Sequence, residues 1–315
     1  MSSRTSLTLP ILAGLWILIV AGLAILQPSA MALSTVTTVL QFSTLLALVS
    51  LGQAMVILGG GAGIDLSVGG TVSLVAIIAM LLDTAGVPSF LLPVVCLVAG
   101  TLLGLVNGIL VTRLRLLPLI ATLGTFYVYS GTALAITGGS AIGGAPAYLL
   151  PWGRGTLAGF PLPFVTLVLP LFVLAVLLLR YTAWGRWIYA FGFNERSARL
   201  VGIPVDRARF IAYGFSGLMA GLAALVSLAW LGSARPNIGQ NLELTSLTAV
   251  MLGGVAIFGG RGGLVGVLAA VLLLVTLQTG LLQLNVNTIW QVGIIGALLI
   301  LVLLVDNIRM IRRTA

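Results

Sequence analysis

The side chains that most often carry catalysis are scarce in this chain. It contains no lysine and no histidine, and its one cysteine, Cys96, lies inside an apolar run. A Walker A phosphate loop requires lysine, and catalytic triads and metal sites built on histidine require histidine, so these sites are excluded. A single cysteine forms neither an intrachain disulfide nor a thiolate metal cluster, and we interpret Cys96 as a small core residue. We expect the energy that drives this protein to come from another molecule.

Charge is concentrated in one stretch, Arg180–Arg209. This stretch holds six of the fifteen arginines and two of the six acids. Placing six arginines at the centre of a bilayer would cost about 15 to 20 kcal/mol on an insertion scale. The stretch must therefore lie in water.

Residues at both ends of Glu195–Val201 predict a helix of about two turns within this stretch. Asn194 is a favourable N-cap, and Gly202 followed by Pro204 is a favourable stop. A helix this short is marginal alone in water, so we expect a partner, either lipid headgroups or a groove on a cytoplasmic protein. The predicted small face carries Asn194, Glu195, Ala198, Val201 and Gly202, and the basic face carries Arg196 and Arg199.

Two glycine-rich clusters interrupt the apolar sequence, at Gly59–Gly70 and Leu252–Gly263. An interior glycine costs a helix about 1 kcal/mol relative to alanine, so both clusters predict breaks. In the first cluster, we expect Asp65 and Ser67 to cap a helix that restarts at Leu66. The cluster is then a tight turn at the membrane interface or a broken helix that lines a transport path, and the two interpretations are compatible.

Composition identifies the elements that must hold these residues. Hydrophobic residues make up 60% of the 315 residues and charged residues only 7%, which is too apolar for a soluble protein of this size. We predict an all-α integral membrane protein with a single transmembrane domain over residues 1–315. Ten segments approach the ~20 residues that cross a bilayer. They are Pro10–Leu26, Val39–Leu58, Leu66–Leu82, Phe90–Val111, Pro118–Thr137, Pro163–Leu179, Phe210–Leu231, Leu244–Phe258, Leu264–Leu282 and Ile289–Val305.

The positions of the arginines predict the orientation of these ten spans. With the N-terminus inside, thirteen of the fifteen arginines are cytoplasmic and only Arg154 and Arg235 lie outside. Both termini and residues 180–209 are then cytoplasmic. The net charge of +9 reflects this topology rather than nucleic-acid binding, because the arginines are scattered between apolar runs. We expect the first span to be retained, although Ala30–Ala32 also fits a signal-peptide cleavage site.

Residues 138–162 form a long loop that the predicted topology places on the extracytoplasmic side. The loop is too long for a simple connection and too rich in glycine to span the membrane. It is either a folded lid over the helices or a docking surface for an extracytoplasmic partner. Candidate docking residues are Trp152, Arg154 and Arg235, because tryptophan and arginine often anchor interfaces.

Six polar residues are candidates for a translocation path, because polar groups inside a membrane are costly and tend to face a cavity or a partner. Each could instead serve helix packing or capping. They are Asp65, Ser67, Asn107, Thr122, Thr125 and Tyr127. A self-contained secondary transporter or channel is the competing class, and it would normally need an intramembrane acid or base, for which Asp65 is the candidate.

Four motifs give the chain a family resemblance. They are GIDLSVGG at residues 63–70, PLIATLGT at 118–125, GRWIYAFGFNERSARLVGIPV at 185–205, and GSARPNIGQNLELTSLTAVMLGGVAIFGGRGGLVG at 232–266. Together they resemble the permease subunit of ribose-type ABC importers, and they are similar to autoinducer-2 importer permeases. Branched-chain amino acid permeases share the architecture but usually lack the acidic GIDLSVG string, so the string favours a monosaccharide or similar polyhydroxylated solute.

The resemblance implies a bacterial inner-membrane transporter of two permease subunits, a cytoplasmic ABC ATPase and an extracytoplasmic substrate-binding protein. ATP and Mg would bind to the ATPase, and the second permease would be a copy of this chain or a sibling. The segment Asn194–Gly202 then matches the coupling helix that contacts the ATPase, with Glu195, Ala198 and Gly202 at its core positions. The chain departs from the family at Phe193, where many members carry glycine. Phe193 either acts as a hydrophobic staple or tunes which ATPase is accepted.

Overall fold

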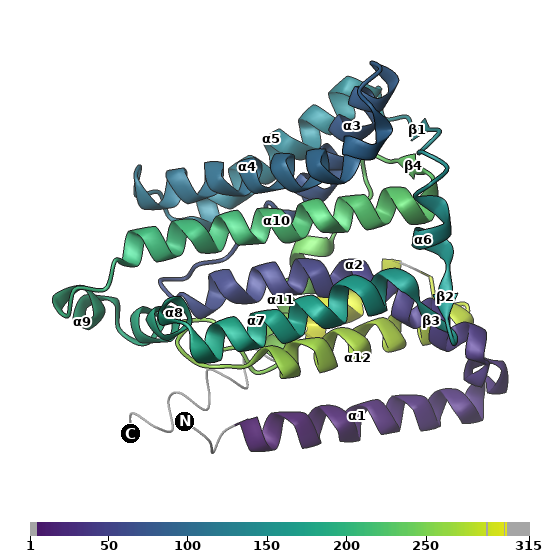
Figure 1. Ribbon diagram of the computed structural model, residues 1–315. Coiled ribbons are helices and arrows are strands. Elements are labelled where there is room, and N and C mark those ends of the chain that lie inside the picture. Colours follow the sequence, from purple (N-terminus) through teal and green to yellow (C-terminus); the bar gives the residue numbers. More distant parts are fainter. Residues whose placement is uncertain (1–4, 288, 299, 301–315) are drawn as a thin grey trace.

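The computed structural model describes residues 5–287, 289–298 and 300, which are mostly helical (Figure 1). The longer helices are α1 (Thr5–Leu26), α2 (Leu33–Leu58), α3 (Val68–Thr84), α4 (Leu92–Thr112), α5 (Pro118–Thr137), α7 (Leu169–Tyr181), α8 (Ala183–Phe193), α10 (Val205–Leu231), α11 (Leu242–Leu252) and α12 (Leu264–Gln283). Shorter elements are η1 (Pro28–Met31), η2 (Ser89–Leu91), β1 (Ile142–Gly143), α6 (Leu150–Arg154), β2 (Thr156–Leu157), β3 (Phe160–Pro161), η3 (Phe164–Val168), α9 (Glu195–Leu200) and β4 (Ser233–Ala234).

Seven helices in the described part of the chain are long and apolar enough to cross a membrane. Three shorter apolar helices, α3, α11 and Ile289–Leu298, fall on the other expected spans. The all-α class is therefore confirmed for the described residues. The expected end of the last span and the arginines near both termini lie outside the described residues.

Two expected spans need correction at the glycine clusters. The expected span Leu244–Phe258 is wrong in its second half, because α11 ends at Leu252 and the following glycine-rich segment is not helical. Four glycines of that segment have positive φ, which a helix does not allow. The third span begins at Val68 rather than Leu66, because the Asp65 carboxylate binds the Ser67 amide and holds a turn ahead of the helix.

α10 runs through the middle of the bundle and packs closely on α4 and α2 (Figure 1). Glycines permit this approach. A Cβ on Gly104 would lie 2.8 Å from the Cα of Gly217, and a Cβ on Gly100 would lie 2.7 Å from the Cα of Gly221. Small residues let helix backbones touch inside a membrane, where the hydrophobic effect gives no drive for helices to associate. Backbones rather than side chains therefore set the distance between α4 and α10.

α3 and α11 are shorter helices that both begin inside the bundle. α3 runs toward the end that carries the strands, called here the strand end, and α11 runs toward the end that carries α9, called here the α9 end (Figure 1). Their starts meet, and the Gly239 amide donates to Ser73 Oγ at 3.0 Å. This opposed pair favours the broken-helix interpretation of the first glycine cluster over a simple interfacial turn.

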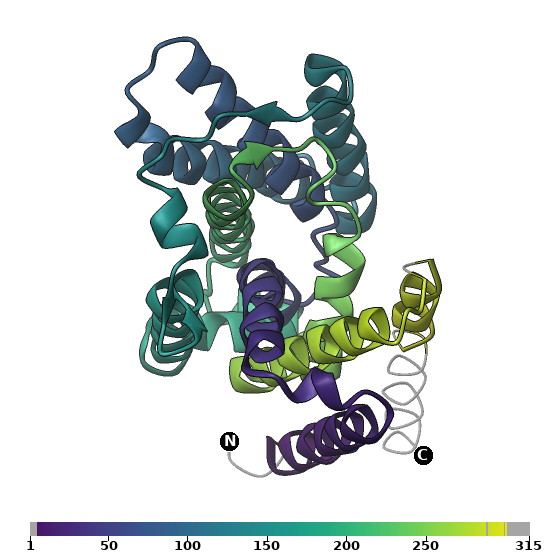
Figure 2. The ribbon, with the colours of Figure 1, turned by 90° about the vertical axis from the view of Figure 1, so that its right-hand side faces the viewer.

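The loop at residues 138–162 is folded over the strand end, which faces the viewer in Figure 2. β1 pairs antiparallel with β4, with Ile142 opposite Ala234, and β2 pairs with β3, with Leu157 opposite Phe160. α6 packs on the last turns of α10, where a Cβ on Gly153 would clash with Ala229. The loop is thus part of the bundle's end wall.

Candidate functional site

α9 is a short helix between α8 and α10, and both of its predicted caps are confirmed. Asn194 Oδ1 accepts a hydrogen bond from the Ser197 amide at 2.9 Å, which makes Asn194 the N-cap. Gly202 has a φ of +82°, and the amides that follow the helix donate back to carbonyls of its last turn. The helix ends one residue before the predicted end.

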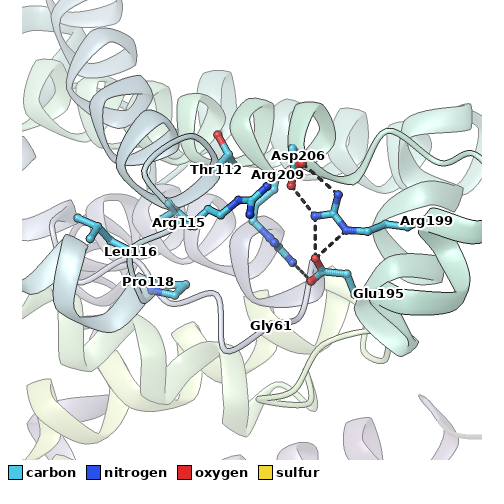
Figure 3. Close-up of a pocket in the computed structure, with 10 residues that line it drawn as sticks. Gly61, Thr112, Arg115, Leu116, Pro118, Glu195, Arg199, Asp206 and Arg209 are labelled. Atoms are coloured by element: carbon cyan, nitrogen blue, oxygen red, sulfur yellow. Dashed lines mark hydrogen bonds and ion pairs between the residues drawn. The ribbon is translucent and has the colours of Figure 1, made fainter.

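Ion pairs fix α9 to the start of α10 (Figure 3). Glu195 binds Arg199 at 2.8 Å and Arg209 at 2.6 Å, and Arg199 also binds Asp206 at 2.6 Å. The Arg209 side chain is only 13% exposed, and its guanidinium lies 5.7 Å from the centroid of the Phe191 ring. Arg199 therefore belongs to this network and not to a free basic face. The network stabilises a helix that would be marginal alone.

The network is charged at neutral pH. Burial by itself would raise the pKa of the Glu195 carboxyl, but the hydrogen bonds and positive charges of Arg209 and Arg199 outweigh it and hold that pKa below its ordinary value. Hydrogen bonds to Asp206 and Glu195 raise the pKa of Arg199. Each partner thus favours the ionised form of the other.

A cavity of 490 Å³ lies beside the ion pairs (Figure 3). It is bounded by the end of α4, the α4–α5 connection, the loop after α2, α9 and the start of α10. Arg115 on its wall has a φ of +55°, which is uncommon for a residue other than glycine. The lining residues are Gly61, Val111, Thr112, Arg115, Leu116, Pro118, Glu195, Arg199, Asp206 and Arg209. α9 therefore shares one cavity with four other parts of the bundle.

Backbone contacts join the α8–α9 junction to both glycine clusters. The Gly260 amide donates to the Leu58 carbonyl at 2.9 Å. A Cβ on Gly60 would lie 2.8 Å from the Cα of Gly192, and a Cβ on Gly260 would lie 2.7 Å from the Cα of Phe193. Glycine is needed here because three chain segments touch through their backbones. The clusters thus meet at the α9 end, which the sequence did not indicate.

The buried and exposed faces of α9 differ from the prediction. Ala198 is buried against the bundle, whereas Leu200 and Val201 are 82% and 77% exposed. Of the predicted small face, Ala198 packs inward, whereas Val201 lies with Leu200 on an apolar edge that points outward. Phe193 is exposed, and the Arg261 guanidinium lies 5.5 Å from the centroid of its ring. That contact does not decide whether Phe193 acts as a hydrophobic staple or tunes which ATPase is accepted.

Four of the six candidate path residues form one buried hydrogen-bond cluster with Ser216. Asp65 Oδ1 accepts from the Ser67 hydroxyl at 2.6 Å and from the Ser67 amide at 3.0 Å, and Oδ2 accepts from the Ser216 hydroxyl at 2.8 Å. Asn107 donates to Ser67 Oγ at 2.7 Å, and Thr125 donates to Asn107 Oδ1 at 2.7 Å. Every hydrogen bond in the cluster is donated in the direction of Asp65. The carboxylate thus has hydrogen-bond donors on both oxygens and needs no positively charged partner. The cluster joins the start of α3 to α4, α5 and α10.

The other two candidate path residues lie on different sides of α5. The Thr122 hydroxyl is buried and donates to the Ile64 carbonyl at 3.2 Å, beside the Asp65 cluster. Tyr127 is 67% exposed and lies on the outer side of the helix, away from the cluster. The part of these residues in a translocation path stays a prediction.

The three candidate docking residues lie at the strand end. Trp152 Nε1 donates to Thr166 Oγ1 at 3.0 Å, and Arg154 Nε donates to the Trp230 carbonyl at 2.8 Å. Arg235 follows β4 directly and is exposed. Trp152 and Arg154 therefore hold the loop in place, and Arg154 and Arg235 are both exposed.

Glu243 is a candidate functional residue that sequence reasoning missed. It lies in the first turn of α11, is 9% exposed, and its Oε2 has no hydrogen-bond partner among the described residues. A Cβ on Gly69 would clash with Oε2, so the carboxylate also faces the start of α3. The carboxyl group of Glu243 therefore lies where the starts of two helices meet. The signal in the sequence is a lone acid at the start of an apolar segment, between two glycine-rich segments.

Acidification should loosen α9. Because the pKa of Glu195 is lowered in the folded protein, its ion pairs stabilise α9 above its ordinary pKa of 4.5 and are lost as the pH falls through the lowered value. We expect a spin label at Val201→Cys, in a Cys96→Ala background, to become more mobile below that pH. A Glu195→Gln variant should be mobile at neutral pH and show a smaller pH step. Equal pH curves for the two proteins would contradict the role of Glu195.

The Asp65 cluster should contribute to stability through Ser216. Ser216→Ala removes one donor from a buried carboxylate, so we expect a loss of about 1 to 3 kcal/mol. The matched control is Ser43→Ala, because the Ser43 hydroxyl is buried without a hydrogen-bond partner among the described residues. Thermal unfolding in detergent should show a clearly lower midpoint for Ser216→Ala than for Ser43→Ala. Equal midpoints would show that the Ser216 contact does not stabilise the bundle.

Comparison with known proteins gives the family. Residues 35–303 match the family described as branched-chain amino acid transport system / permease component. The ribose import permease protein of Bacillus subtilis (strain 168) is 37% identical over 296 residues, covering 93% of this chain and 91% of that protein. The autoinducer 2 import system permease protein of Yersinia pseudotuberculosis serotype O:3 (strain YPIII) is 36% identical over 312 residues, covering 94% and 92%. No solved structure gives a significant match. The chain belongs to this family of transport-system permease components.

Proposed function

We propose that this chain is the permease subunit of a binding-protein-dependent ABC importer for a monosaccharide or similar polyhydroxylated solute. The relatives at 35–37% identity are ribose and autoinducer 2 import permeases and align over almost the whole chain, which supports this class of solute. The acidic string at residues 63–70 supports it too, because branched-chain amino acid permeases usually lack this string. The branched-chain amino acid name of the family describes the wider group.

The observation that carries the proposed mechanism is the outward edge of α9. Leu200, the last residue of α9, and Val201, which follows it, are apolar and largely exposed, and ion pairs hold this helix on α10. An ordered apolar edge of this kind fits a groove on a partner protein. We assign it to the cytoplasmic ABC ATPase, which would bind ATP and Mg, because this chain has no lysine for a Walker A loop.

The proposed orientation places the α9 end in the cytoplasm of a bacterial inner membrane, with ten spans and both termini inside. The arginines support this orientation, because Arg113, Arg115, Arg261 and the six in residues 180–209 belong to the α9 end. Arg154 and Arg235 lie at the strand end, where a substrate-binding protein would dock on the folded loop and on Arg235. A positive bias of this size is typical of cytoplasmic loops.

The proposed mechanism is alternating access. ATP binding closes the ATPase dimer and moves α9, whose caps Asn194 and Gly202 and buried Ala198 keep it rigid and seated on the bundle. The pair Glu195–Arg209 passes the movement to α10. α10 then shifts the cluster around Asp65, and the solute passes between two permease subunits.

A polar substitution on the outward edge of α9 should uncouple the transporter. Leu200→Asp removes apolar contact area from the proposed ATPase interface, so we expect binding-protein-stimulated ATP hydrolysis in proteoliposomes to fall by about tenfold or more. The matched control is Leu114→Asp, because Leu114 is 62% exposed in the α4–α5 connection at the same end.

Both variants should insert and fold, since neither side chain is buried.

Gly202→Trp should also uncouple ATP hydrolysis from the binding protein, because a left-handed cap disfavours any side chain. If Leu200→Asp and Gly202→Trp keep full stimulation, α9 is not the coupling element.

A further inference from the structure

The cavity beside α9 has no part in the proposed transport mechanism. Its volume of 490 Å³ lies within the range of roughly 300 to 1,000 Å³ that is usual for small-molecule sites. Its walls come from five segments: the loop after α2, the end of α4, the α4–α5 connection, α9 and the start of α10 (Figure 3). A ligand held there would contact segments that are far apart in the sequence.

The cavity walls carry a net positive charge. Three arginines and two acids line it, namely Arg115, Arg199, Arg209, Glu195 and Asp206. Both acids are already bound by arginines, Glu195 by Arg199 and Arg209, and Asp206 by Arg199. The remaining positive charge belongs to Arg115, which makes no ion pair or hydrogen bond with the described residues. Its side chain extends from the α4–α5 connection toward Arg209 (Figure 3).

Arg115 also occupies a backbone position that suits glycine. The amides of Leu114 and Leu116 donate back to the carbonyls of Ile109 and Leu110, so α4 ends in a turn in which Arg115 has a φ of +55°. Glycine adopts this left-handed conformation readily at the end of a helix, whereas a side chain is strained there. Strain of this kind is found where a residue must be held in place for a ligand. The turn thus holds a guanidinium group on the cavity wall at a cost in stability.

We propose that this cavity binds the phosphate group of a small hydroxylated molecule, either a soluble phosphate ester or the phosphoglycerol headgroup of an anionic lipid. The planar guanidinium group of Arg115 can donate two parallel hydrogen bonds to phosphate oxygens, and Arg209 adds a second positive charge. α5 begins at the cavity with Pro118, so the positive end of its dipole lies there too. The inference goes beyond the proposed function and uses it only to place the cavity on the cytoplasmic side.

The acids of the cavity fit a ligand that carries hydroxyl groups as well as phosphate. Each Asp206 oxygen accepts one hydrogen bond from Arg199 and has a lone pair left. The Thr112 hydroxyl donates to the Gly108 carbonyl at 2.7 Å, so its oxygen is able to accept. A bare phosphate ion has few protons to donate to these acceptors, whereas a hydroxylated ester can satisfy them. A ligand bound in this way would lie between the α4–α5 connection and α9 and would oppose movement of α9.

Thermal unfolding of the full-length chain in a neutral detergent tests the site. A ligand that binds only the folded protein raises the unfolding midpoint as its concentration increases. The probes are glycerol 3-phosphate, inorganic phosphate and glycerol. We expect a saturable rise with glycerol 3-phosphate, a half-saturating concentration about tenfold higher with inorganic phosphate, and no rise with glycerol over the same concentrations.

Arg115→Gly separates binding from folding. It removes the guanidinium group and relieves the strained backbone, so the unliganded variant should unfold at the same or a higher midpoint. Its half-saturating concentration for glycerol 3-phosphate should rise at least tenfold. The matched control is Arg113→Gln, because Arg113 is exposed at the end of the same helix but does not line the cavity. Binding to the control should be unchanged.

Nanodiscs distinguish the two sources of the phosphate group. Binding of glycerol 3-phosphate is compared in phosphatidylcholine alone and in phosphatidylcholine mixed with phosphatidylglycerol. If a lipid headgroup fills the cavity, phosphatidylglycerol should stabilise the unmodified protein more than Arg115→Gly and weaken binding of the soluble ester about tenfold. If the ligand is soluble, the two nanodiscs should give the same binding. Both results support a phosphate site and identify its source.

Three results would overturn the site. They are no rise in midpoint with either glycerol 3-phosphate in detergent or phosphatidylglycerol in nanodiscs, equal binding to the unmodified protein and to Arg115→Gly, and equal responses to glycerol and glycerol 3-phosphate. None of these measurements needs an ATPase or a binding protein. A failure of the site is therefore distinguishable from a failure of the proposed transport function, which uptake measurements test.

Discussion

The close approach of α10 to α4 is the contact on which the rest of the structure depends. Inside a membrane, apolar side chains gain little by leaving lipid for protein, so helices associate through packing and hydrogen bonds. Glycines on both helices bring the backbones together over several turns, and side chains at these positions would force them apart. This contact places α10 at the centre of the bundle, where it packs on α2, α3, α4, α6 and α8.

α10 carries one contact for each proposed site. Arg209 near its start binds Glu195 of α9, Ser216 in its first half binds Asp65 ahead of α3, and the carbonyl of Trp230 near its end binds the loop at the strand end. A helix of 27 residues is stiff over this length. In the proposed importer, a displacement of α9 would be carried by this one helix to the centre and to the opposite end, which would couple ATP use to solute movement.

Local features were predictable from the sequence, and distant contacts were not. The caps Asn194 and Gly202 follow from rules that span a few residues, and the spans follow from apolar runs. The exposure of Leu200 and the burial of Ala198 depend on how α9 packs on α10. The spacing of apolar residues in the sequence does not predict that packing. The hydrogen bond between Ser216 and Asp65 joins residues 151 positions apart. Glycine runs predicted breaks correctly, but not that the two clusters would touch.

The central claim is that the Glu195–Arg209 pair links α9 to α10, and a charge exchange tests it most directly. Because Arg199 also binds Glu195, the variants Glu195→Arg, Arg209→Glu and their combination are made in an Arg199→Gln background, and they are compared with that background for binding-protein-stimulated ATP hydrolysis in proteoliposomes. Each single reversal places like charges together and should abolish the stimulation, and the double reversal restores the pair and should recover most of it. Full stimulation in both single variants, or no recovery in a folded double variant, would contradict the account.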